Sequence, residues 1–143
     1  MKRKHYILIG ILAIALIGAY TVWRMYTKGP KDVLAAYGLK IKATDLYHQF
    51  SKDSIKANIQ YGDKILEIKG TLKSQSDNNQ HQQVLLLDSG LDGASVNCTM
   101  EERSERKDGE QITIKGICTG MGQGDEDLGI KGDVYIIRAY AIK

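Results

Sequence analysis

The hydrophobic pattern of the chain changes twice, and each change marks a different kind of element. Residues 6–23, YILIGILAIALIGAYTVW, contain no charged side chain. Eighteen residues at about 1.5 Å each cover most of a hydrocarbon layer of ~30 Å, so this run predicts a helix long enough to cross a membrane. From residue 43 the apolar positions recur at helical spacing, and from residue 64 they alternate with polar ones. The pattern therefore predicts an apolar N-terminal helix, a short helical segment and then strands.

The helical segment spans residues 43–60, ATDLYHQFSKDSIKANIQ. Leu46 and Phe50 lie four residues apart on one face, and Thr44 and Asp53 are suitable N-caps for one or two short helices. The second turn leads into Ile55 and Ala57, which we expect to face the rest of the domain.

Alternation typical of half-buried strands follows in five segments. They are residues 64–74, 81–89, 94–100, 110–120 and 133–142. No helical pattern lies between these segments to carry parallel crossovers. The fold class expected from the pattern is therefore mainly β, a small barrel or sandwich preceded by one or two short helices and an N-terminal transmembrane helix.

Charge is unevenly distributed along the chain. Six of the twenty Lys and Arg residues occur at or before residue 31, and no acid precedes Asp32. The fourteen bases and seventeen acids from Asp32 onward give that part a net charge of −3. A slightly acidic domain argues against a general electrostatic attraction to nucleic acid.

The basic residues 2–4 come directly before the apolar run and predict a cytoplasmic N-terminus. We expect a basic cytoplasmic tail over residues 1–5, a transmembrane anchor over 6–26, a linker over 27–38 and a β-domain over 39–143. The protein would then be a single-pass protein of the cell inner membrane with a periplasmic, extracytoplasmic domain. A cleaved signal peptide ending near residues 17–20, IGAY, is the alternative.

Ten residues of the domain carry a resemblance to a known family. They are Tyr61, Gly62, Lys64, Gly70, Cys98, Gly116, Cys118, Thr119, Gly120 and Asp133. In this order they resemble the tRNA_anti-like family of small bacterial OB-fold proteins, whose members are often membrane-tethered or lipoproteins. The resemblance runs from about residue 43 to residue 142. It implies a five-stranded OB-fold barrel and brings no activity with it.

The chain departs from the pattern of that family at residues 121–132, which lie within a glycine- and acid-rich stretch, ICTGMGQGDEDLG. A Walker loop needs a Lys-Ser/Thr pair that opens a helix, and an EF-hand loop begun at Asp125 would lack its glycine and its glutamate. We therefore interpret the stretch as a loop between the last two strands, which in an OB-fold flanks the usual binding face. The candidate binding residues of this loop are Gly120, Gly122, Gly124, Asp125, Glu126 and Asp127, and its three acids are also the candidates for a metal cation.

The usual binding face of an OB-fold lies on the second and third strands. Residues 82–100 contain neither an aromatic residue nor Lys or Arg. Domains that bind single strands stack bases on aromatic rings and neutralise phosphates with cations, so the sequence argues against a nucleic-acid partner. We expect the aromatic residues of the domain to pack in its core. They are Tyr37, Tyr47, Phe50, Tyr61, Tyr135 and Tyr140.

The sequence offers little catalytic chemistry. The three histidines, His5, His48 and His81, are scattered, and no His/Cys spacing matches a zinc site. No Ser or Cys lies in a motif with a recognisable base. We therefore expect neither an enzyme nor a cofactor.

The two cysteines, Cys98 and Cys118, alternate with inward apolar residues on the third and fourth strands. An even count in an extracytoplasmic domain predicts a disulfide, and the alternative is a pair of free buried thiols. The function expected from these observations is a membrane-anchored OB-fold module that binds a protein or another envelope ligand. The alternatives are a cytoplasmic nucleic-acid binder and a structural envelope-stress domain without a small ligand.

Overall fold

The computed structural model describes residues 2–27, 32–125 and 127–143. It divides into two units, residues 1–32 and 33–143. The first unit contains one helix, α1 (Lys2–Thr27), so the apolar run is helical as predicted.

The transmembrane anchor expected over residues 6–26 is confirmed only as a helix. Within the part of the chain that the structure describes, no helix is both long and apolar enough to cross a membrane. The side chains at residues 6–9, 11 and 24–26 lie outside the described residues.

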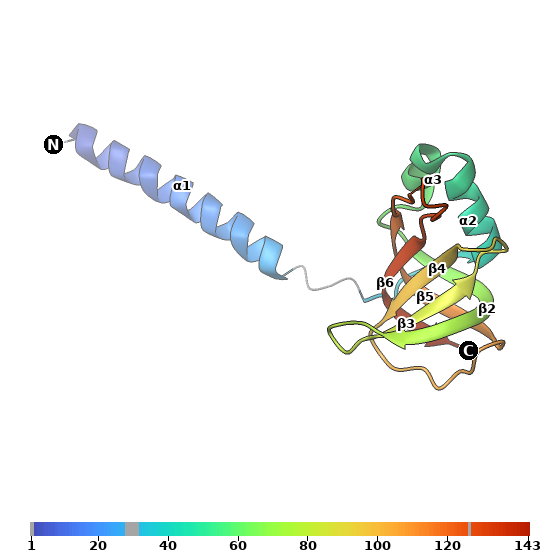
Figure 1. Cartoon of the computed structure of the whole chain (residues 1–143). Coiled ribbons are helices and arrows are strands. Elements are labelled where there is room, and N and C mark those ends of the chain that lie inside the picture. The colour runs from blue at the N-terminus through green and yellow to red at the C-terminus, as the bar shows by residue number, and fades with distance from the viewer. Residues whose placement is uncertain (1, 28–31, 126) are drawn as a thin grey trace. The chain divides into compact units, whose positions relative to one another are not determined.

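The second unit is a closed barrel of five strands, and each of them corresponds to one of the predicted segments (Figure 1). They are β2 (Ile65–Asp77), β3 (Gln83–Asp88), β4 (Ser95–Met100), β5 (Gln111–Met121) and β6 (Val134–Ile142). The order around the barrel is β2-β3-β4-β6-β5, and β5 pairs back onto β2. The β4–β6 pair is parallel and the other pairs in the barrel are antiparallel. This is the strand order of an OB-fold, as the resemblance implied.

A further strand, β1 (Leu39–Lys42), was not predicted. It pairs in parallel with residues 66–69 of β2 and leads directly into the helix α2 (Ala43–Lys52). Because the backbone stays extended through Lys42, that residue is the N-cap of α2, and the cap predicted at Thr44 is wrong. The cap predicted at Asp53 is confirmed, since its carboxylate accepts a 3.0 Å hydrogen bond from the Lys56 N–H at the start of α3 (Ser54–Tyr61).

The helix α2 covers one end of the barrel and completes the hydrophobic core. Leu46 and Phe50 are fully buried on its inner face, as the four-residue spacing predicted. Ala43 packs so closely on β2 that a Cβ at Gly70 would lie 2.9 Å from the Ala43 Cβ. The strands supply the remaining large side chains of the core, which are Leu66, Ile68, Leu72, Leu85, Leu87, Met100, Ile114 and Ile136.

The aromatic residues divide between the core and the surface. Tyr47 and Phe50 are buried, and Tyr61 packs against the core. Tyr37 is 83% exposed and Tyr135 is 42% exposed, so their predicted places in the core are wrong. On β6 the neighbours of Tyr135 point inward, and the alternation of a strand therefore turns its ring outward.

The disulfide predicted between Cys98 and Cys118 is also wrong, because both cysteines are free and buried. Alternation does turn both side chains inward, but β6 lies between β4 and β5. Each cysteine is the register partner of Ile136, from opposite sides. Two strand spacings of about 4.8 Å separate the Cα atoms by roughly 9–10 Å, beyond the span of about 4.4–6.8 Å that a disulfide bridges.

Candidate functional site

The loop between β5 and β6, residues 122–133, is a short hairpin held by its own backbone and by one carboxylate. Asp125 and Ile130 exchange two backbone hydrogen bonds of 2.8 Å. The Asp125 carboxylate accepts hydrogen bonds from the N–H groups of Asp127 and Leu128, at 3.1 and 3.2 Å. This is an Asx turn, in which the side chain fixes the local backbone.

Two of the three acids of this loop are described by the structure. Glu126 lies outside the described residues, and the Asp125 carboxylate accepts the hydrogen bonds of the turn. Among the residues that are described, no three metal-ligating side chains come together. The cation site that includes Glu126 therefore stays a prediction.

The glycines of the loop let its two arms pack against each other. A Cβ at Gly132 would overlap the carbonyl oxygen of Gly122, and a Cβ at Gly124 would overlap that of Ile130. A Cβ at Gly122 would lie 2.7 Å from Cε2 of Tyr135. The spacing of the glycines is thus explained by close backbone packing, and neither a phosphate nor a calcium ion is needed to account for it.

Two hydrogen bonds fix the base of the loop to the rest of the domain. The buried hydroxyl of Tyr47 donates to the Gly132 carbonyl at 2.9 Å, and the Asp133 carboxylate accepts from the Ser95 N–H at 2.8 Å. Burial, and then the negative charge of Asp133, raise the pKa of Tyr47 above its usual value of 10.0. The phenol therefore stays protonated and remains a donor at neutral pH.

A groove of about 540 Å³ lies between α2 and this loop. We call it the loop–helix groove. A second hollow of about 320 Å³ shares Phe50, Ser54 and Met121 with it and continues along α3. Aromatic and thioether side chains, serine hydroxyls and the backbone of the loop together line the main groove. Its residues are Tyr47, Phe50, Ser51, Ser54, Met121, Gly122, Gly124, Gly129, Ile130, Lys131 and Gly132.

Exposed apolar side chains lie in the second hollow and on the loop. Ile55 and Ile59, one turn apart on α3, line the second hollow and are each 76% exposed. On the loop, Ile130 lines the main groove and is 55% exposed, and Leu128, next to the lining residue Gly129, is 71% exposed. The prediction that Ile55 faces the domain is wrong, because on α3 only Ala57 is buried. A groove with an apolar border and a few hydroxyl groups is typical of ligand-binding sites.

The predicted binding residues fall into two groups. Gly120, Gly122 and Gly124 line the groove or the hollow beside it. Asp125 and Asp127 lie outside the lining and are exposed. Ser51, Ser54 and Ile59, which line the groove or the hollow, were not predicted. Their only signal was their place on the outward side of the helical segment, which does not distinguish a binding residue from an ordinary surface residue.

Comparison with known proteins identifies the family. The family model of tRNA_anti-like matches residues 1–127 of the chain. The chain belongs to the tRNA_anti-like family. The match ends before β6, whereas the resemblance in the sequence ran from about residue 43 to residue 142. None of the curated proteins matches this tRNA_anti-like chain.

Among solved structures, one similar to this tRNA_anti-like protein is the crystal structure of a putative aspartyl-tRNA synthetase from Leishmania major Friedlin. The two share 9% sequence identity with a TM-score of 0.45, over 86% of this chain and 25% of the synthetase. The chain thus spans about a quarter of that protein's length, and at this level of similarity the match adds nothing on function.

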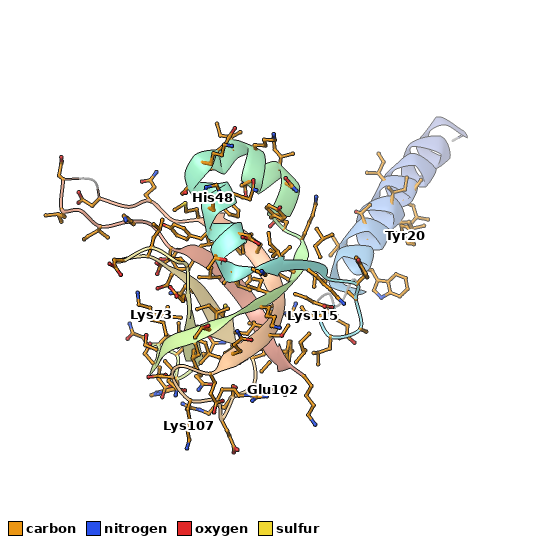
Figure 2. All side chains as sticks on the ribbon, turned by 90° about the vertical axis from the view of Figure 1, so that its right-hand side faces the viewer. Tyr20, His48, Lys73, Glu102, Lys107 and Lys115 are labelled. Atoms are coloured by element: carbon orange, nitrogen blue, oxygen red, sulfur yellow. The ribbon has the colours of Figure 1, made fainter. Side chains whose placement is uncertain are left out.

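The usual OB binding face of this tRNA_anti-like domain bears few charges. Leu86 on β3 pairs with Asn97 on β4, which in turn pairs with Tyr135 on β6, and these side chains are half-buried or exposed on the outer surface. Val84 and Thr99 form the next pair along β3 and β4. Tyr135 is thus an aromatic residue on this face that the sequence analysis had assigned to the core. Elsewhere, His48 lies exposed on α2 (Figure 2).

Proposed function

We propose that this protein is an OB-fold interaction module that binds an apolar segment of another protein in the loop–helix groove. The observation that carries the proposal is the set of exposed apolar side chains that line the groove and the hollow continuous with it. They are Ile130 in the groove and Ile55 and Ile59 in the hollow, and the two spaces share the lining residues Phe50, Ser54 and Met121. Burying a Leu or Ile side chain contributes about 1.5–3 kcal/mol, so covering two or three of these side chains supports a specific complex.

The polar groups of the groove favour a peptide over a lipid or a hydrocarbon. Ser51 and Ser54 carry hydroxyl groups beside the apolar lining, and the loop presents its glycine backbone without side chains in the way. These groups can exchange hydrogen bonds with the backbone of a bound segment, whose apolar side chains would contact Phe50 and Met121. Among the described residues, Lys131 is the one charged residue of the lining, so these residues make little demand on the charge of the ligand.

The cellular location that we propose rests on the sequence alone. The uncharged residues 6–23 follow the basic residues 2–4, and this arrangement favours a membrane tether with a cytoplasmic N-terminus and an extracytoplasmic domain. Protease added to intact spheroplasts should then degrade residues 33–143. Protection of the domain until the cells are lysed would place it in the cytoplasm and contradict this part of the proposal.

Site-specific photo-crosslinking in native membranes tests the binding proposal. A photoreactive residue at position 59 or at position 128 should give the same crosslinked protein band, because position 59 lines the second hollow and position 128 is next to Gly129, which lines the connected groove. The same residue at position 37, which is highly exposed on the segment before β1, is the matched control and should not give that band.

A double variant then shows whether the band depends on the groove. Ile55→Ser with Ile59→Ser should abolish the crosslink from position 128 without unfolding the domain, because both side chains are exposed. If the band persists in this variant, or forms equally from position 37, the groove is not the binding site.

A further inference from the structure

A second groove, on a different part of the barrel, gathers lysine side chains. It has a volume of about 530 Å³, and we call it the lysine groove. Lys40 and Lys42 come from β1, Lys69 comes from β2, and Lys143 follows β6. Its other lining residues are Ile41, Asp45, Glu67, Thr113 and Ile142. None of these residues lines the loop–helix groove, so the inference drawn from them does not rest on the proposed function.

The lysine side chains of this groove have no partners among the residues that the structure describes. Across the described residues, no hydrogen bond or ion pair engages the side-chain nitrogen of Lys40, Lys42, Lys69 or Lys143. The nearby Glu67 carboxylate is already engaged, because it lies 3.6 Å from the nearly buried ammonium group of Lys115 (labelled in Figure 2). That leaves the carboxylate of Asp45 to face these lysines from within the groove.

The register of the strands places two of these lysines side by side. Lys42 is the direct partner of Lys69 in the parallel β1–β2 pair, and both side chains are exposed. Like charges directly opposite each other destabilise a strand pair. A bound anion would remove this repulsion. On the next strand Lys69 pairs with Thr113, whose hydroxyl can donate a further hydrogen bond to the same anion.

The lining also indicates what kind of anion fits. A neighbouring hollow of about 350 Å³ shares Lys42 and Lys69 and adds Thr44, Thr71 and Gln111, together with Asp88. No aromatic residue of the described part of the chain lines either hollow, so these residues offer the bases of a nucleic acid no ring on which to stack. The adjacent positions of Lys42 and Lys69 and the hydroxyl groups beside them suit a compact group with several acceptor oxygens.

We propose that the lysine groove binds a phosphate group carried by a small ligand or by a lipid headgroup. The ammonium groups of Lys42 and Lys69 hold the phosphate oxygens, and Lys40 and Lys143 add positive charge at the ends of the groove. The domain is slightly acidic as a whole, so this local gathering of lysines is what draws the anion to this one surface.

Calorimetric titration of the full-length chain with inorganic pyrophosphate tests the proposal. Pyrophosphate should bind saturably, and binding should weaken as salt is added. Lys42→Gln with Lys69→Gln should reduce the affinity at least about tenfold, because two charge-assisted hydrogen bonds are lost. Lys52→Gln with Lys56→Gln removes the same charge from exposed helical positions and is the matched control, which should bind normally. Absence of saturable binding, or an equal loss in both double variants, would overturn the proposal.

Thermal melting shows whether the Lys42/Lys69 double variant is folded. Without ligand, the Lys42/Lys69 double variant should melt at the same temperature as the wild type or higher, because a repulsive pair is removed. Pyrophosphate should raise the melting temperature of the wild type alone.

Binding to lipid vesicles distinguishes the source of the phosphate. If phosphatidylglycerol vesicles bind the wild type more tightly than the Lys42/Lys69 double variant, and phosphatidylcholine vesicles bind the two proteins equally, the phosphate belongs to a lipid headgroup. Equal binding of both proteins to both vesicles, with pyrophosphate binding intact, identifies a soluble ligand.

Discussion

The hydroxyl of Tyr47 donates a hydrogen bond to the carbonyl oxygen of Gly132, 2.9 Å away, and joins α2 to a loop 85 residues further along the chain. Both groups are buried, so Tyr47→Phe leaves the carbonyl without its hydrogen-bond donor. We expect this variant to lose about 1–2 kcal/mol of unfolding free energy in urea, and the amides of residues 122–132 to exchange faster with deuterium.

Tyr140→Phe is the control for that variant. The Tyr140 hydroxyl has no hydrogen-bond partner among the residues that the structure describes, and its removal should change neither quantity. An equal loss of stability in the two variants would show that the tether to the loop contributes nothing.

The packed arms of the β5–β6 loop give a second prediction. In Gly132→Ala the new Cβ overlaps the Gly122 carbonyl, and backbone atoms cannot move aside as the end of a side chain can. We expect a loss of about 1–3 kcal/mol and loss of the crosslink from position 128. Gly129→Ala is a contrasting variant, because its Cβ meets open space and only the positive φ of 67° opposes it. Gly129→Ala should lower the free energy of unfolding by roughly 1 kcal/mol and leave the crosslink in place.

The two buried cysteines predict how stability depends on pH. Burial raises the pKa of Cys98, and the charge of Cys118 adds to the effect. Burial also raises the pKa of Cys118, partly offset by a hydrogen bond from the Gly120 backbone and reinforced by Asp63. In the unfolded chain both thiols ionise near pH 8.5. Above that pH the folded state holds more protons than the unfolded state, so stability falls as pH rises, by up to about 1.4 kcal/mol per unit for each thiol.

Urea unfolding between pH 7 and pH 10 measures this slope, and Cys98→Ala with Cys118→Ala should flatten it. Thiol titration without reductant gives an independent reading. Two thiols per chain should react in denaturant and neither should react in the native protein. If no thiol reacts until reductant is added, the cysteines are bridged and the register described above is incorrect.

The ion pair between Lys115 and Glu67 gives a fourth prediction. The side chain of Lys115 is 9% exposed, and its ammonium group also donates to the Leu34 carbonyl at 3.1 Å. Glu67→Gln leaves a nearly buried cation without its counter-charge and should cost about 2 kcal/mol in urea unfolding. Lys115→Met with Glu67→Gln removes the buried positive charge as well. This double variant should lose less free energy of unfolding than Glu67→Gln alone. A double variant less stable than Glu67→Gln would show that the ammonium group is stabilising without its acid.

The alternation of apolar residues is a local property, and it predicted every strand of the barrel. It also correctly turned Cys98 and Cys118 inward. The order of strands around the barrel depends on pairing between distant segments, which alternation does not contain, and so the insertion of β6 between the two cysteines was missed. The same limit applies to β1, whose four residues are too few to show a period.

The two candidate grooves were predictable to different degrees. The glycines of the β5–β6 loop were visible in the sequence, and four of them line the loop–helix groove, at positions 122, 124, 129 and 132. The lysine groove was not visible in the sequence. Lys42 and Lys69 lie 27 positions apart and meet only through the parallel pairing of β1 with β2. Ile55 has the same apolar character as a core residue, and only the docking of α3 through Ala57 decides that it faces solvent.

The position of β6 also determines when the barrel can close during synthesis. Until residues 134–142 have left the ribosome, β4 and β5 each lack the partner that lies between them, and both present an open edge. Such edges pair readily with other chains. Until β6 emerges, four strands of the barrel are present and the barrel is open, so pairing of β6 with both edges is the step that removes these sites of aggregation.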